Sequence, residues 1–241
     1  MPLRAAAICG LLAPVTFIVG LLLGDLAQAD TFSPANDDIS DLGAQTADQA
    51  WLYNQIAANL NGLLIVAFAL GLWRALGPGW LARLGVLGLA VIGVTRFLEG
   101  FLRLDCGGMD EVCENTSWQA DGHRFESGIA SALFFLVPLL LAFAFRRLPQ
   151  WRELWLPTLL VVPVVLAVSI VVSLIGDGAA VRAASITWFI WLALVAWRLL
   201  RVADNPARTT HTPVRTPERG GDQEPRRDDG WMESAAALLR H

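Results

Sequence analysis

Long runs of apolar residues, separated by short polar segments, make up most of this chain. Six such runs cover about residues 5–24, 56–76, 80–104, 127–145, 154–175 and 181–200. Each run holds roughly 20 residues, the length that an α-helix needs to cross the hydrocarbon core of a bilayer. Backbone groups in lipid must be satisfied within the segment, which favours helices over open strands. The pattern therefore predicts an all-α, polytopic membrane protein folded as a six-transmembrane-helix bundle.

The composition changes near Asp204. The following residues are rich in Pro, Thr, Arg and Asp, and they show no apolar periodicity until Trp231. Such a segment buries too little apolar surface to offset the entropy of ordering the chain. We expect a six-helix transmembrane domain at residues 1–203 and a disordered cytoplasmic tail at residues 204–241.

Composition supports the membrane class and excludes one class of partner. Hydrophobic residues make up 55% of the 241 residues, above the roughly 45–50% of soluble domains. The sequence pI is about 5.3, and no basic stripe of the kind that binds nucleic acid is present. We therefore expect the lipid bilayer as a partner and no nucleic acid.

The arginines predict the orientation. Eight of them flank the runs on one side: Arg4, Arg74, Arg83, Arg146, Arg147, Arg152, Arg198 and Arg201. Only Arg103, Arg124 and Arg182 fall on the other side. Basic residues favour cytoplasmic loops, so we expect a multi-pass protein of the plasma (inner) membrane with both termini cytoplasmic. A cleaved signal peptide ending at Ala27-Gln28-Ala29 is the alternative for the first run, which is longer than the usual apolar core of a signal peptide.

Three ionisable residues share one face near the end of the third run. Arg96, Glu99 and Arg103 are spaced i, i+3, i+7, which places them on the same side of a helix. Charged groups at membrane depth are costly and are usually paired and turned towards the bundle or water. We expect Arg96 and Glu99 to pair, either lining a polar pocket that opens outward or forming a structural ion pair with Arg103 at the interface.

The loop after that run carries the candidate catalytic residues His123, Asp105 and Glu126. A histidine beside carboxylates can act as a general base, a proton shuttle or a metal ligand. A zinc site is disfavoured because zinc sites commonly use several His, and the chain has three, two of them in the tail. We expect no metal and no cofactor; a weak, oxygen-rich divalent cation site and a solvated loop histidine are the alternatives.

The same loop contains two of the three cysteines, Cys106 and Cys113. An outward loop lies in an oxidising compartment, so the pair predicts a disulfide, with metal binding as the weaker alternative. Ser40 and Asn54 lie at the entry to the second run and join Arg96, Glu99 and Arg103 as candidate ligand-binding residues.

Several short motifs resemble one bacterial family. They are Ser40-Asp41-Leu42-Gly43, Asn54, Gly62-Leu63, the series Gly85, Gly88 and Gly93, and the ordered set Asp105-Cys106, Cys113, Ser117-Trp118 and His123. In order and spacing they are similar to the six-span integral membrane family called domain of unknown function 998, in its branch with a paired-cysteine loop. The resemblance covers roughly residues 5–200. It implies a topology and a set of polar positions but no reaction. Arg103-Leu104 precedes Asp105 where the family would lead us to expect a Pro-containing stretch.

Three functions are compatible with these features. The first is the binding of a small molecule or a lipid head group in an outward-facing polar pocket. The second is a membrane-embedded hydrolase-type enzyme that acts on a lipid or envelope substrate. The third is a small-solute or proton transporter that uses Arg96 and Glu99 as a relay. The sequence contains no Gly-rich phosphate loop, no G-x-S-x-G and no H-E-x-x-H motif, so it leaves open whether the protein is an enzyme.

Overall fold

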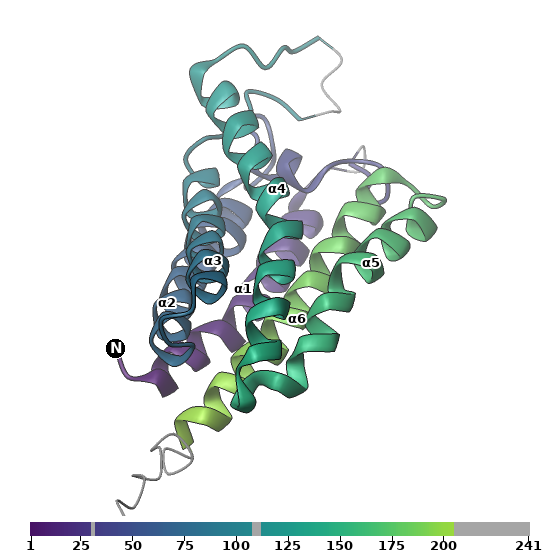
Figure 1. Cartoon of the computed structure of the whole chain (residues 1–241). Helices are drawn as coiled ribbons and strands as arrows, with labels where there is room; N and C mark the ends of the chain where they lie inside the picture. The colour runs from purple at the N-terminus through teal and green to yellow at the C-terminus, as the bar shows by residue number, and fades with distance from the viewer. Residues whose placement is uncertain (30–31, 108–111, 205–241) are drawn as a thin grey trace, which may run out of the picture. The chain divides into compact units, whose positions relative to one another are not determined.

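The computed structural model describes residues 1–29, 32–107 and 112–204. Within these residues the long elements are all helical, as Figure 1 shows. They are α1 (Leu3–Ala27), α2 (Asn61–Ala75), α3 (Trp80–Glu99), α4 (Trp118–Arg147), α5 (Trp155–Val172) and α6 (Asp177–Asp204). Three short helices join them: η1 (Ile39–Gly43), η2 (Tyr53–Leu60) and η3 (Pro149–Leu154). The predicted all-α fold is confirmed, and the predicted disordered tail lies outside the described residues.

The six long helices pack in a closed ring that follows chain order. Each helix packs against its neighbours in sequence, and α6 returns to pack against α1. The interior is filled by large apolar side chains such as Phe17, Ile65, Leu89 and Trp188, all of them buried. This arrangement brings α1, α3, α4 and α6 around a common interior near the end of the bundle that carries the disulfide loop.

Close approach of α2 and α3 depends on two glycines. A Cβ on Gly62 would lie 2.4 Å from the backbone nitrogen of Phe97, and a Cβ on Gly93 would lie 2.9 Å from the carbonyl oxygen of Gly62. Small residues let membrane helices approach backbone to backbone. This contact fixes the height of α3 against α2, and therefore the height of Arg96 and Glu99 in the bundle.

Six helical segments are long and apolar enough to cross a membrane; the second is η2 with α2 (Tyr53–Ala75) and the fifth is η3 with α5 (Pro149–Val172). Many large apolar residues on their outer faces are exposed, for example Leu22, Leu87, Leu166 and Ile190. In water such faces would be costly, whereas in lipid they match their surroundings. The protein is thus a multi-pass membrane protein; its membrane and the side of its termini stay predictions.

Two helices begin or end away from the predicted span limits. The fourth helix begins at Trp118 rather than at residue 127, because Ser117 caps it and its hydroxyl accepts a hydrogen bond from the Ala120 amide at 3.2 Å. The third helix ends at Glu99 rather than at residue 104. There Gly100 packs against η2, and a Cβ on Gly100 would lie 2.4 Å from the Asn59 side chain. Hydropathy marks the apolar core of a helix but not the polar turns at its ends.

The second span also begins earlier than predicted, through a π-helical segment. η2 runs from Tyr53 to Leu60 and continues directly into α2. π-helical turns are rare and frequently accompany functional sites. Here the segment carries Tyr53 and Asn54, both buried, to the end of the bundle where the polar groups gather.

Candidate functional site

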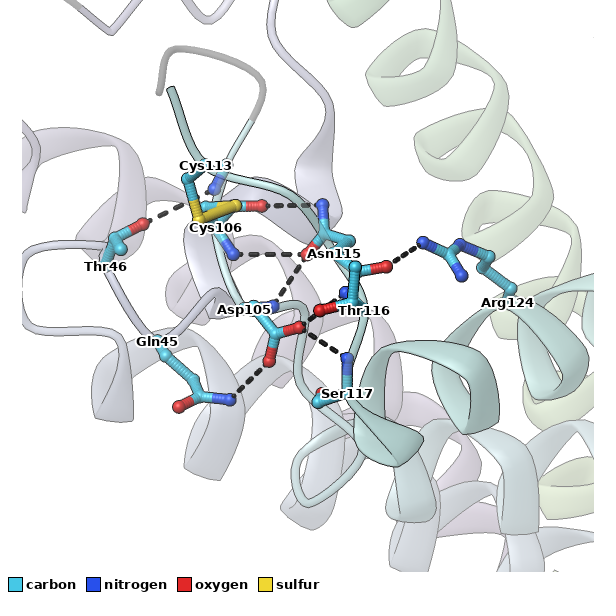
Figure 2. The surroundings of a disulfide bond; sticks show 10 residues. Gln45, Thr46, Asp105, Cys106, Cys113, Asn115, Thr116, Ser117 and Arg124 are labelled. Carbon is cyan, nitrogen blue, oxygen red and sulfur yellow. Dashed lines mark hydrogen bonds between the residues drawn. A yellow bond between two sulfur atoms is a disulfide. The ribbon is translucent and has the colours of Figure 1, made fainter. Parts of the chain in front are cut away.

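A disulfide joins Cys106 to Cys113, as the sequence predicts (Figure 2). Asn115 holds the residues next to it: its side-chain oxygen accepts hydrogen bonds from the Asp105 and Cys106 amides at 2.7 and 3.1 Å. Its amide nitrogen donates to the Cys106 carbonyl at 3.1 Å. Hydrogen bonds from Asn115 therefore join the two ends of the loop between α3 and α4 next to the disulfide.

Asp105 is engaged with the loop itself. Its carboxylate accepts hydrogen bonds from the Thr116 and Ser117 amides at 2.9 and 2.8 Å and from the Gln45 side chain at 3.0 Å. Hydrogen bonds from Ser117, followed by that from Thr116, hold the pKa of Asp105 below its usual value of 3.8. Charge-stabilising amide donors act in this direction. Within the described ranges Asp105 contacts these loop groups rather than His123, so the geometry gives it a structural place in the loop.

Arg96 and Glu99 form the expected ion pair on α3. The Tyr53 hydroxyl donates to the other carboxylate oxygen of Glu99 at 2.7 Å, and a second guanidinium nitrogen of Arg96 donates to the Ala57 carbonyl at 3.0 Å. The pair is thus tied to η2 as well as to its own helix. Glu99 is buried, while the Arg96 side chain is 18% exposed.

His123 lies in the second turn of α4, and Glu126 lies on the same face; both side chains are buried. Its Nδ1 is 3.0 Å from the Leu102 carbonyl oxygen and 3.5 Å from a Glu126 carboxylate oxygen. Its Nε2 is 3.4 Å from the Ser127 hydroxyl, which also donates to Glu126 at 3.1 Å. The expectation that His123 and Glu126 share a helix face is confirmed.

These groups line one cavity of about 480 Å³. Its charged and titratable lining comes from α3, α4 and the segments that enter α2: Asp38, Tyr53, Arg96, Glu99, His123, Arg124 and Glu126. Hydroxyls of Ser40, Ser127, Ser131 and Ser185 complete the polar lining. The volume falls in the range of small-molecule sites, roughly 300–1,000 Å³.

A second cavity of about 350 Å³ adjoins the first and is mainly apolar. It is lined by residues of all six long helices, among them Phe17, Phe134, Trp188 and Phe189. Six residues line both cavities: Phe17, Arg96, Ala130, Ser131, Val181 and Ser185. The polar cavity and the apolar cavity are therefore neighbours, with Ala130 and Arg96 at their junction.

The other candidate ligand-binding residues divide into two groups. Ser40 lines the polar cavity, half-buried on η1. Asn54 is buried and donates to the Gly43 carbonyl at 3.0 Å, and Arg103 is exposed beyond the end of α3. Asn54 and Arg103 border only a narrow crevice beside the cavity. The ligand-binding and catalytic roles of all these residues stay predictions.

Sequence reasoning missed six of the polar residues that line the polar cavity, three of which are Tyr53, Ser127 and Ser185. Tyr53, Ser127 and Ser185 line the polar cavity, and Tyr53 bonds directly to Glu99. Ser127 was recoverable from spacing, because it follows His123 by four residues and so faces the same side of a helix. Tyr53 and Ser185 come from other helices, and no spacing along the chain brings them to Glu99 or His123.

Among the described residues no group of three or more His, Cys, Asp or Glu side chains lies close enough together to hold a metal ion. The carboxylates of Glu99 and Glu126 already face the cations and donors named above. The functional groups that line the polar cavity are thus an ion pair, an imidazole, carboxylates and hydroxyls.

One family model, described as "Protein of unknown function (DUF998)", matches residues 11–198. The chain belongs to this family. The resemblance carried by the short motifs and the cysteine pair is thereby confirmed. No curated protein and no solved structure matches the chain. Membership of DUF998 brings no reaction with it, so any function for this member must be argued from its own side chains.

Proposed function

We propose that this DUF998 protein binds an amphiphilic lipid, with the polar head group in the cavity beside Arg96 and His123 and the acyl chain in the adjoining apolar cavity. The observation that carries the proposal is the pair of adjoining cavities, one polar and one apolar, that share Arg96 and Ala130. A water-soluble metabolite would use only the first. A simple hydrocarbon would use only the second.

The charges of the polar cavity favour a head group with both signs or hydrogen-bonding capacity. Arg96 and Arg124 supply positive charge, and Glu99, Glu126 and Asp38 supply negative charge. Arg96 stands at the junction of both cavities, which is the place that a phosphate or ester group between head and chain would occupy. A guanidinium recognises such oxyanions well through its planar set of donors.

The first test measures thermal unfolding of the full chain in detergent with a short-chain lysophosphatidylcholine. We expect the lipid to raise the unfolding temperature by mass action. Glycerophosphocholine, which is the head group without the chain, should raise it much less. The shift should disappear in Ala130→Trp, because the indole would fill the junction between the cavities.

Ala132→Trp is the matched control. Ala132 lies on the same helix, is exposed, and is absent from the lining of both cavities. It should keep the full lysolipid shift. An equal shift in the Ala130 and Ala132 variants, or a shift from glycerophosphocholine as large as that from the lysolipid, would overturn the proposal.

A further inference from the structure

We infer that Ser127 and His123 form a nucleophile and general-base pair that cleaves the acyl ester of the bound amphiphile. The inference rests on the proposed lipid binding, because the cavity that would hold the head group is the one into which both side chains project. It adds a reaction to that binding site and assigns the attacking atom to the Ser127 hydroxyl.

The hydrogen bonds of His123 decide which ring nitrogen can act as the base. Nδ1 faces the Leu102 carbonyl oxygen at 3.0 Å and a Glu126 carboxylate oxygen at 3.5 Å. Both neighbours accept hydrogen bonds, so we assign the ring hydrogen of the neutral imidazole to Nδ1. Nε2 then carries a free lone pair that faces the Ser127 oxygen at 3.4 Å. The Ser127 hydroxyl donates to Glu126 at 3.1 Å in this structure, so its hydrogen must rotate to Nε2 before attack.

The distance and the exposure of the two groups suit an activated serine. The Ser127 oxygen lies 3.4 Å from His123 Nε2, longer than an ideal hydrogen bond but typical of a site without substrate, which tightens when substrate binds. His123 is buried, whereas Ser127 is half-buried and lines the cavity. The base is therefore shielded, and the nucleophile is open to a ligand.

Nearby charge favours the anion that forms during attack on an ester. Arg96 lines both cavities next to the serine's helix, and Ser131, one turn beyond Ser127, lines both as well. Positive charge and hydroxyl donors in a partly enclosed site stabilise a developing oxyanion. The ester of a lipid whose head lies in one cavity and whose chain lies in the other would sit at this junction.

The proposed reaction has two steps. In the first, the Ser127 oxygen attacks the ester carbonyl carbon while His123 Nε2 takes its proton. The carbon–oxygen bond to the alcohol then breaks, and the alcohol leaves with that proton. In the second, water attacks the acyl-Ser127 carbonyl, gives its proton through His123 to the Ser127 oxygen, and releases the carboxylic acid. No oxidant, metal or further reactant is needed.

The experiment uses the purified full chain in detergent with two probes, lysophosphatidylcholine hydrolysis and an alkyl fluorophosphonate that labels activated serines. We expect fatty acid release and a covalent label that maps to Ser127. Ser127→Ala should lower the hydrolysis rate by up to about 10⁶-fold, the loss seen when a nucleophilic serine is removed, and should abolish the label.

A second variant separates chemistry from folding. In His123→Asn the side-chain amide can still donate to the Leu102 carbonyl, but the base nitrogen is gone. It should keep the lysolipid thermal shift, lose hydrolysis and label slowly. Ser173→Ala, which removes an exposed serine that lines neither cavity, should keep both activity and label.

The outcomes for the two proposals differ. A lysolipid thermal shift without hydrolysis or labelling would overturn the esterase inference and leave lipid binding standing. Absence of the thermal shift together with absence of hydrolysis would overturn both. Hydrolysis that persists in Ser127→Ala, or a label at another serine, would overturn the assignment of the nucleophile.

Discussion

Two of the arginine–carboxylate pairs among the described residues are largely buried, and they differ in what surrounds them. Arg96 and Glu99 pair on α3 beside the polar cavity, whereas Arg182 of α6 pairs with Asp25 of α1 at 2.7 Å. Both arginines are largely buried, and each lies near an aromatic ring, Phe17 for Arg96 and Phe32 for Arg182. By burial and pairing alone the two sites are alike.

The difference lies in the remaining hydrogen bonds and in the space nearby. Arg182 also donates to the Asp37 and Gly178 carbonyls at 2.8 and 3.2 Å, so it fastens α6 to α1 and to the loop that follows α1. It is absent from the lining of both cavities, whereas Arg96 lines each of them. The Arg182 pair therefore joins helices together, whereas the Arg96 pair also borders open space in which a ligand could bind.

The largest effect should follow from breaking the Arg182 pair. Arg182→Ala would leave the Asp25 carboxylate buried without its cation, a loss of about 3–5 kcal/mol in the free energy of unfolding. Unfolding in mixed detergent micelles measures it. The double variant Asp25→Leu with Arg182→Met, which removes both charges, should recover most of the loss.

The lysolipid thermal shift tests whether the Arg182–Asp25 pair also takes part in lipid binding. It should keep its size in the double variant, because neither Arg182 nor Asp25 lines either cavity. A lysolipid shift lost in that variant but kept in Arg96→Met would reverse the roles that we assign to the two pairs.

A middle-sized effect should follow from Tyr53→Phe, which removes the hydroxyl that donates to Glu99. A buried hydrogen bond to a charged group contributes about 1.5–3 kcal/mol, so the free energy of unfolding should fall by that order. Arg96 would keep its ion pair with Glu99, but Glu99 would lose the hydrogen bond from Tyr53 that helps to hold this pair in position. We expect weaker lysolipid binding in a titration, with Trp51→Phe, an exposed ring at the start of the same span, as the unaffected control.

The smallest effect should come from Asp105, which bonds to loop amides outside the spans. Its folded pKa is depressed below 3.8, so its stabilising contribution is present above that value and is lost as the pH falls through the folded pKa. The protection of the Thr116 and Ser117 amides from hydrogen exchange, measured relative to their intrinsic exchange rates, should fall on acidification below about 3.8. In Asp105→Asn this protection should be lower at neutral pH and nearly unchanged by the same acidification. Equal pH dependence in both proteins would contradict the role of Asp105 in the loop.

Much of the candidate site was visible in the sequence because it is local. Arg96 and Glu99 are three residues apart on one helix, as are His123 and Glu126, and helical geometry alone brings each pair together. Cys106 and Cys113 share one loop. Asp105, a candidate catalytic residue in the sequence, instead has its carboxylate bound by the loop amides of Thr116 and Ser117. Backbone amides are present in every loop, and the sequence does not reveal which carboxylate they bind.

By itself the sequence determined the class of the protein, its six spans and the residues that must avoid lipid, since these depend on the length and hydropathy of continuous segments. Only the tertiary structure decided that Arg182 closes the ring against Asp25, that Tyr53 meets Glu99 from another helix, and that a polar cavity adjoins an apolar one. These features depend on how helices distant in sequence rotate and approach one another. That geometry follows from side-chain packing over the whole bundle, at contacts such as Gly62 against Gly93, and is absent from the pattern along any one helix.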